Sequence, residues 1–147
     1  MALRRMERLL MIENIHRLPD WPRRLNEYLA VAMRKDFRLG RHDCCTFAAG
    51  AVEAMTGVDP MVEFRGQYAT WDEARAALAT IGARSLYATL RAKFGRAVPG
   101  ALGQRGDVAY HEKSCGVVVG RNAIFFGAHG YVMIPITQLQ RAFRVPF

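Results

Sequence analysis

Apolar residues recur at intervals of three and four through the first two thirds of the chain, the spacing of a helix with one buried face. Four segments carry this pattern, and each follows an Asp, Thr or Ser that can accept hydrogen bonds from the first turn of a helix. Glycines end the pattern in the last three segments. Helices are therefore predicted after Asp20, Asp43, Thr70 and Ser85, with ends at Gly57, Gly82 and Gly95 for the last three.

The pattern changes after residue 100, where short apolar runs alternate with turns that contain Gly and Asn. Gly120 to Asn122 predicts a hairpin turn, and one helical turn is expected at 137–141. Helices followed by a small antiparallel sheet predict an α+β fold. The predicted strands are residues 108–110, 115–119, 123–126, 131–134 and 143–145.

Size and composition fit one domain, because 147 residues of which 51% are hydrophobic can bury a core. We expect a single domain at 18–147 behind an N-terminal arm at 1–17. The arm is basic and apolar, but its apolar block is shorter than the roughly 7 residues of a signal-peptide core. No apolar run reaches the roughly 18 residues of a membrane span. The sequence therefore predicts a protein made in the cytoplasm, with no membrane span.

The net charge of +8 is compatible with nucleic acid, an anionic glycan or an acidic protein as partner. The arginines are dispersed, however, and lack the interleaved aromatic side chains of RNA-binding surfaces. A solvated basic face is the favoured interpretation. A nucleic-acid-binding module is the least favoured of three functional hypotheses.

Cys44, Cys45 and Cys115 are the three cysteines of the chain. Adjacent cysteines rarely bond to each other and an odd number leaves one thiol free, so this is not the disulfide framework of a secreted domain. Three thiolates are too few for a structural zinc site or an iron–sulfur cluster by themselves, and no CxxC spacing exists. The histidines have no HxxxH or HxH spacing. Neither a metal nor another cofactor is predicted.

Cys44 opens the second predicted helix, directly after Asp43. Unpaired backbone N–H groups and the helix dipole at such a position stabilise a thiolate, so Cys44 is a candidate nucleophile. The alternative is a small apolar residue on the buried face. Asp43 is expected to cap the helix rather than to act in catalysis, and Gly57 to end it. Asp107 is expected to fix the turn into the first predicted strand.

Three elements resemble, in order and spacing, the papain-like superfamily of NlpC-type cell-wall peptidases. Asp43-Cys44 resembles the start of the central helix of that family, and Gly106-Asp107-Val108 its later Gly-Asp strand. The run from Ser114 to Gly120 resembles its next strand, which opens with His-Val-Gly. The resemblance covers about residues 37–135. It implies a papain-like fold, with the central helix packed on a small C-terminal antiparallel sheet.

The chain resembles still more closely an uncharacterised subgroup encoded by tailed phages and prophages beside tail-tip genes. This likeness implies a structural or assembly component of the tail tip, made in the cytoplasm of the bacterial host and assembled into the virion tail. The implied partners are other tail-tip and hub proteins, with peptidoglycan a further candidate. The similar segments are Gly40-x-His42-Asp43-Cys44, Thr56-Gly57-Val58-Asp59-Pro60, Phe64-Arg65-Gly66-x-Tyr68 and the end of the chain near Arg144-Val145.

The resemblance also implies where a catalytic base would lie. The histidine of the family aligns with Ser114, which is no base near neutral pH, and the position that orients the base aligns with the apolar Phe126. His111 is the substitute base that the sequence offers. The sequence therefore favours a non-catalytic protein built on a peptidase-derived fold. The alternative is an active cysteine peptidase or amidase that cleaves peptidoglycan peptides during genome delivery, with Cys44 as nucleophile.

Overall fold

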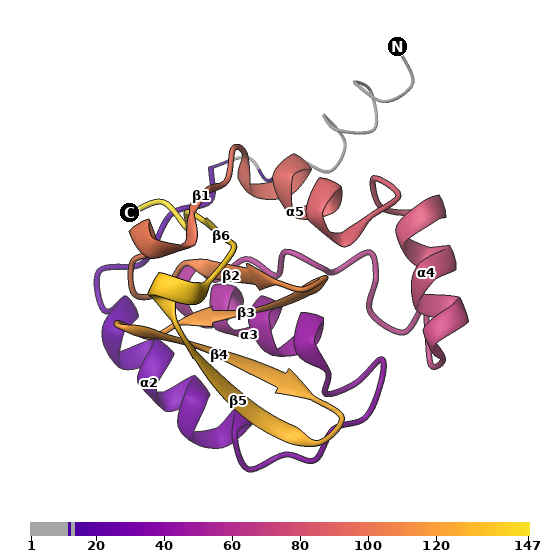
Figure 1. Cartoon of the computed structure of the whole chain (residues 1–147), viewed down its shortest axis with the longest axis horizontal. Coiled ribbons are helices and arrows are strands. Elements are labelled where there is room, and N and C mark those ends of the chain that lie inside the picture. Colours follow the sequence, from indigo (N-terminus) through magenta and orange to yellow (C-terminus); the bar gives the residue numbers. More distant parts are fainter. Residues whose placement is uncertain (1–11, 13) are drawn as a thin grey trace.

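The computed structural model describes residue 12 and residues 14–147. In this part of the chain, four α-helices precede a sheet that lies in the C-terminal third (Figure 1). Each helix begins directly after its predicted cap, so the four helix predictions are confirmed. None of these helices is both long and apolar enough to cross a membrane. The helices are α2 (Trp21–Ala32), α3 (Cys44–Thr56), α4 (Trp71–Thr80) and α5 (Leu86–Phe94).

The described strands form one antiparallel sheet, in the order β1-β6-β2-β3-β4-β5. Two short 3₁₀ helices, η1 (Gly100–Leu102) and η2 (Ile136–Gln138), connect strands. Helices and a separate antiparallel sheet make the fold α+β, as predicted. The strands are β1 (Val98–Pro99), β2 (Val108–His111), β3 (Ser114–Val118), β4 (Asn122–Gly127), β5 (Gly130–Pro135) and β6 (Arg141–Phe143).

Two details of the sheet differ from the prediction. The last strand is Arg141–Phe143 rather than 143–145, because the backbone N–H of Val145 donates to Oδ1 of Asp107 at 3.2 Å instead of joining the ladder. The edge strand β1 was not predicted, since two residues are too few to show a period. Pro99 has no backbone N–H to donate, and it is tolerated because an edge strand has a neighbouring strand on one side only.

Capping explains why α3 begins and ends where it does. Oδ1 of Asp43 accepts the backbone N–H of Thr46 at 2.9 Å, and Oγ1 of Thr46 accepts the N–H of Asp43 at 2.7 Å. Gly57 ends the helix in the left-handed region, at φ 79°. Both predictions are confirmed. Asp20 precedes α2 without capping it, because its carboxylate pairs with two arginines of the first helical turns.

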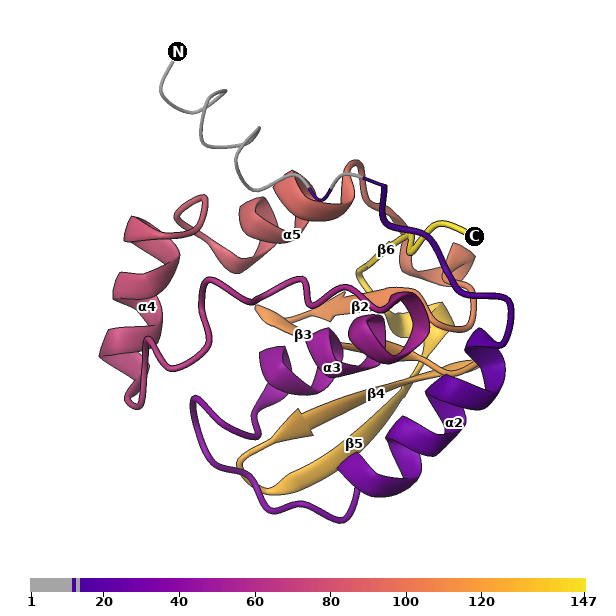
Figure 2. The ribbon, with the colours of Figure 1, turned by 180° about the vertical axis from the view of Figure 1, so that it is seen from behind.

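The main core lies between α3 and one face of the sheet, with α2 beside α3 (Figure 2). Phe47 and Val52 of α3 pack in one cluster with Val117 of β3 and Phe143 of β6. Burying side chains of this size stabilises the fold by about 1.5–3 kcal/mol each. The opposite face of the sheet carries a second, smaller cluster. The sheet therefore fixes α3, and with it the head of that helix.

Asp107 ties the turn before β2 to both ends of the described chain. Its Oδ2 accepts the backbone N–H of Gln104 at 2.8 Å, which confirms its predicted role in the turn. Its Oδ1 also pairs with Nη2 of Arg17 at 3.1 Å, and both side chains are about 1% exposed. Arg144 adds a contact to Oδ2 at 3.2 Å. A buried carboxylate with this many donors is fully satisfied.

Most of the predicted N-terminal arm, residues 1–17, lies outside the described residues. Arg17, its last residue, is buried in the domain. Its guanidinium lies 4.3 Å from the centre of the Trp21 ring and 4.4 Å from that of Phe147. The structured domain therefore includes Arg17.

Candidate functional site

The loop before α3 holds Cys44 in place through Asp43, which is 2% exposed. Oδ2 of Asp43 accepts the backbone N–H of Gly40 at 2.8 Å and the hydroxyl of Tyr68 at 2.7 Å. Gly40 has φ +86°, and a Cβ there would lie 2.1 Å from the carbonyl oxygen of Tyr68. Only glycine fits this turn. The carboxylate therefore joins the loop, the helix cap and the Tyr68 segment around the head of α3.

Three thiols meet at the head of α3. The sulfurs of Cys44 and Cys45 lie 3.8 Å apart, and the Cys115 sulfur of β3 lies 3.7 Å from that of Cys45. Cys115 also lies 3.8 Å from the carbonyl oxygen of Cys44. All three sulfurs fall within 4.8 Å of one another, and all three cysteines are free. We call these residues the thiol cluster.

The three thiols differ in acidity. The neighbouring thiols of Cys115 and Cys45, with the Ser114 hydroxyl, stabilise a thiolate and hold the pKa of Cys44 well below its usual range, against the effect of burial. Donation toward neighbouring sulfurs and burial raise the pKa of Cys45 and of Cys115. Cys44 is therefore the cysteine that ionises first, as expected for a thiol at a helix N-terminus.

All four histidines lie within the described residues, and none of them hydrogen-bonds to the Cys44 thiol. Nδ1 of His111 accepts the backbone N–H of Gln140 at 3.3 Å, and its ring packs near Phe125 of the second cluster. Cys115 packs in the main core instead. The structure therefore places His111 on the sheet face opposite α3 and does not supply it as a substitute base.

Two neighbouring residues of β3 lie beside Cys44. Cys115 faces α3, and the Ser114 hydroxyl hydrogen-bonds to the Cys44 thiol. Successive side chains alternate across a sheet, and Cys115 shares the face of Val117, which packs in the main core. Ser114 is half-buried at the start of β3 and contributes to the low pKa of Cys44. Phe126 is buried in the same core. Alternation from Val117 could have placed Cys115 on the core face of the sheet from the sequence, but not beside Cys44.

A cavity of about 500 Å³ opens beside the thiol cluster. Its walls come from α3, the segment between α3 and α4, α4, α5, β2 and β3, and all three cysteines line it. Most of the other lining side chains are apolar, among them Met61, Phe64 and Leu90. Lys113 adds positive charge, whereas Lys93, which also lines the cavity, pairs with Glu63. The cavity is large enough for a small ligand to reach the sulfurs.

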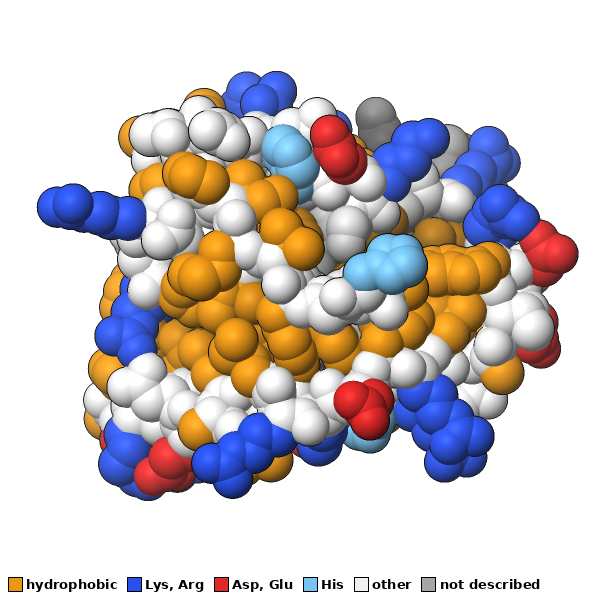
Figure 3. Space-filling view, turned by 60° about the horizontal axis from the view of Figure 1, so that its bottom comes forward, with side chains coloured by type: hydrophobic (Ala, Val, Ile, Leu, Met, Phe, Trp, Pro, Cys, Tyr) orange, Lys and Arg blue, Asp and Glu red, His pale blue; other side chains and the backbone are white. Residues whose placement is uncertain are grey.

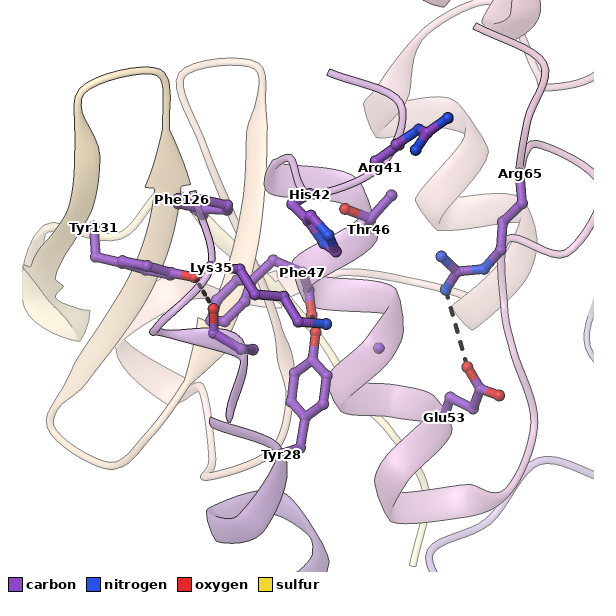
Figure 4. A pocket seen from close by; sticks show the side chains of 12 residues that line it. Tyr28, Lys35, Arg41, His42, Thr46, Phe47, Glu53, Arg65, Phe126 and Tyr131 are labelled. Carbon is purple, nitrogen blue, oxygen red and sulfur yellow. Dashed lines mark hydrogen bonds and ion pairs between the residues drawn. The ribbon is translucent and has the colours of Figure 1, made fainter. Parts of the chain in front are cut away.

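A second, more polar pocket of about 230 Å³ lies on another side of α3 (Figure 4). Lys35, Arg41 and His42 line it, so His42 belongs to this pocket and not to the thiol cluster. Arg65 reaches Glu53 across the mouth at 3.9 Å. The Tyr131 hydroxyl closes another side by donating to a backbone carbonyl of α2. The pocket is basic, but nothing in it resembles a catalytic arrangement.

An apolar area lies on the face of the molecule shown in Figure 3, with Arg and Lys side chains at its rim. In the described part of the chain, strand β5 forms one edge of the sheet. Its Val132 and Met133 are 56% and 55% exposed. An edge strand with exposed apolar side chains is a candidate surface for contact with another protein.

Comparison with known proteins identifies a family. The model of a family described as "Domain of unknown function (DUF6950)" matches residues 16–145, a range that spans the whole site. No curated protein and no solved structure matches the chain.

Proposed function

Since the chain belongs to the DUF6950 family, a domain of unknown function, we propose a function from the site and from the resemblance of the sequence. The protein is a non-hydrolytic structural or assembly component of the tail-tip region of a phage or prophage. It is built on the papain-like fold of NlpC-type cell-wall peptidases. Its partners are other tail-tip and hub proteins.

One observation carries the non-hydrolytic part of this proposal. The Cys44 sulfur has thiols as neighbours, and none of the four histidines hydrogen-bonds to it. A cysteine peptidase needs a base that takes the thiol proton and returns it to the leaving amine. Cys115 cannot do this because its pKa is raised. The nucleophile position is therefore kept without the proton transfer that peptide cleavage needs.

The arrangement of elements supports the papain-like assignment. Cys44 begins a helix that packs on an antiparallel sheet, and the Gly106-Asp107 turn leads into β2 of that sheet. β2 is followed directly by β3, the strand on which the resemblance places a base. These are the relations that the three resembling motifs imply. The tail role itself rests on the closer resemblance of the sequence to the phage and prophage subgroup.

The surface offers a means of docking. Val132 and Met133 expose apolar area on edge strand β5, and the net charge of +8 suits an acidic neighbouring protein. In an assembled particle, β5 is the surface that we expect to be covered. Val132→Asp with Met133→Asp adds two like charges to this edge while leaving the core unchanged, so it disrupts docking without unfolding the domain.

Particle composition tests the proposal. The protein is expressed with an affinity tag in a bacterium that produces the phage or prophage encoding it, and purified tails are analysed by mass spectrometry. The wild-type chain is expected in tails, and the double Asp variant is expected to be depleted. Absence of the wild-type chain from both mature tails and tail-assembly intermediates contradicts the assembly role.

The alternative function, an active cysteine peptidase or amidase that acts on peptidoglycan, is favoured by two observations. The pKa of Cys44 is lowered, and the residue lines a cavity of about 500 Å³. It requires a base, and His111 is the candidate from the sequence. Cleavage of stem peptides that is lost in both Cys44→Ala and His111→Ala would favour this alternative.

A further inference from the structure

The thiol cluster has the dimensions of a metal-binding site. We propose that Cys44, Cys45 and Cys115 bind one thiophilic metal ion, with Zn²⁺ the expected ion, and leave one coordination position open to the cavity. This proposal does not depend on the assembly role proposed above, since either a structural protein or an enzyme can bind a metal ion at such a site.

Distances between the sulfurs support this inference. In a tetrahedral centre with metal–sulfur bonds of about 2.3 Å, the sulfurs lie about 3.8 Å apart. The Cys44–Cys45 and Cys45–Cys115 separations are 3.8 and 3.7 Å. The third pair lies within 4.8 Å, so a shift of about 1 Å along this edge completes the triangle.

The surroundings favour the charge that such a site carries. In the metal-bound state all three cysteines are thiolates, so each thiol that is still protonated releases its proton. Three thiolates and one divalent ion leave one net negative charge on the centre. Cys44 and Cys45 are the first two residues of α3, a helix of 13 residues, so the positive end of the helix dipole lies near this charge. Lys113 lines the same cavity and adds positive charge, whereas Lys93 already pairs with Glu63. Soft sulfur ligands select zinc or copper(I) over magnesium and calcium.

Within the described residues, the three cysteines are the only metal-binding side chains in the cluster, so the fourth position has no protein ligand there. The Asp43 carboxylate, the nearest acidic group in the loop, already accepts three hydrogen bonds, from Thr46, Gly40 and Tyr68. The sulfurs line a cavity of about 500 Å³. Water or a small anionic or thiol ligand from that cavity can therefore complete the coordination, as in zinc sites that keep an open position.

Cobalt(II) is the probe, because its bonds to thiolate give an intense sulfur-to-cobalt charge-transfer absorption. The reduced full-length protein is freed of metal with a chelator and titrated with Co²⁺ under argon. We expect the absorption to saturate at one ion per chain and to disappear when Zn²⁺ is added. No charge-transfer absorption, or saturation well above one ion per chain, overturns the site.

Variants assign the ligands. Removal of a residue that only supports a metal ligand typically weakens metal binding about 10- to 100-fold. Loss of a ligand itself is expected to weaken Zn²⁺ binding further, in each of Cys44→Ser, Cys45→Ser and Cys115→Ser. His111→Ala is the matched control, because it removes a metal-binding side chain near Cys115 that faces away from the cluster. Its affinity is expected to equal that of the wild type. Binding that survives each cysteine substitution but is lost with His111 overturns the assignment.

A measurement on the unmodified chain guards against variants that do not fold, since Cys115 is buried. The reduced wild-type protein is alkylated with iodoacetamide with and without one equivalent of Zn²⁺, and each cysteine is quantified by mass spectrometry. Zn²⁺ is expected to slow the labelling of Cys44 and Cys45 at least tenfold. Equal labelling with and without Zn²⁺ means that the thiols are packed only as small apolar groups, and contradicts the proposal.

Discussion

The sulfur of Cys115 lies 3.7 Å from the sulfur of Cys45, although 70 positions separate the two residues in the chain. β3 therefore meets the head of α3 through a thiol. Under the papain-like fold proposed above, an active peptidase is expected to carry an imidazole on this strand. A buried thiol with a raised pKa keeps its proton near neutral pH, so it packs against the helix but cannot accept a proton from Cys44.

Alkylation against pH is expected to separate Cys44 from the other two thiols. A lowered pKa means that Cys44 stays ionised as the pH falls, and its reaction slows only when the pH drops through that pKa. In reduced, chelator-treated protein, the midpoint for Cys44 is expected below the free value of about 8.5. Cys45 and Cys115, whose pKa values are raised, are expected to react only at higher pH.

Two variants identify what lowers the pKa of Cys44. Ser114→Ala removes a hydroxyl that stabilises the thiolate, so the alkylation midpoint of Cys44 is expected to rise. His111→Ala is expected to leave the midpoint unchanged, because the ring packs near Phe125 on the other sheet face. A midpoint that rises with His111→Ala and not with Ser114→Ala would contradict the described geometry.

Gly40 is expected to be far less tolerant of alanine than Gly66. Both have positive φ, +86° and +75°, which costs a non-glycine residue about 1–2 kcal/mol. A Cβ at Gly66 meets nothing within 4 Å, whereas one at Gly40 would lie 2.1 Å from the Tyr68 carbonyl oxygen. Denaturant unfolding should show that Gly40→Ala costs about 1–3 kcal/mol more than Gly66→Ala. Equal losses would mean that the loop before α3 does not pack on the Tyr68 segment.

Loss of the buried pair between Asp107 and Arg17 is expected to be costly. Asp107→Asn leaves the Arg17 guanidinium buried without its counter-charge, at a cost of about 3–5 kcal/mol in the free energy of unfolding. Asp72→Asn removes an exposed partner of Arg75 and is the matched control, with an expected cost below about 1 kcal/mol. Thermal and denaturant unfolding measure both. A loss at Asp107 no larger than at Asp72 would contradict the burial of this pair.

The helices and the α+β class could be predicted because their signals are local. Asp43, Thr70 and Ser85 cap the turns that directly follow them, and Gly57 ends α3 by its own backbone freedom. The position of the last strand could not be predicted, since it depends on a bond from Val145 to the distant Asp107.

The candidate site likewise has one part that the sequence predicts and one part that depends on the tertiary structure. The placement of Cys44 at a helix N-terminus follows from its neighbours in the sequence, whereas the meeting with Cys115 depends on the register between β3 and α3. Three cysteines without CxxC spacing gave no local sign of a cluster. The separation of His111 from Cys44 likewise depends on the sheet face to which β2 turns that side chain.

Hydrolysis is the measurement that tests the central claim most directly. Purified, reduced protein is incubated with bacterial peptidoglycan, and released peptides are quantified by mass spectrometry beside the Cys44→Ala variant. A protein whose Cys44 has no base is expected to release no more peptide than Cys44→Ala at any pH at which it stays folded. Release by the wild type that is abolished in Cys44→Ala would contradict the claim.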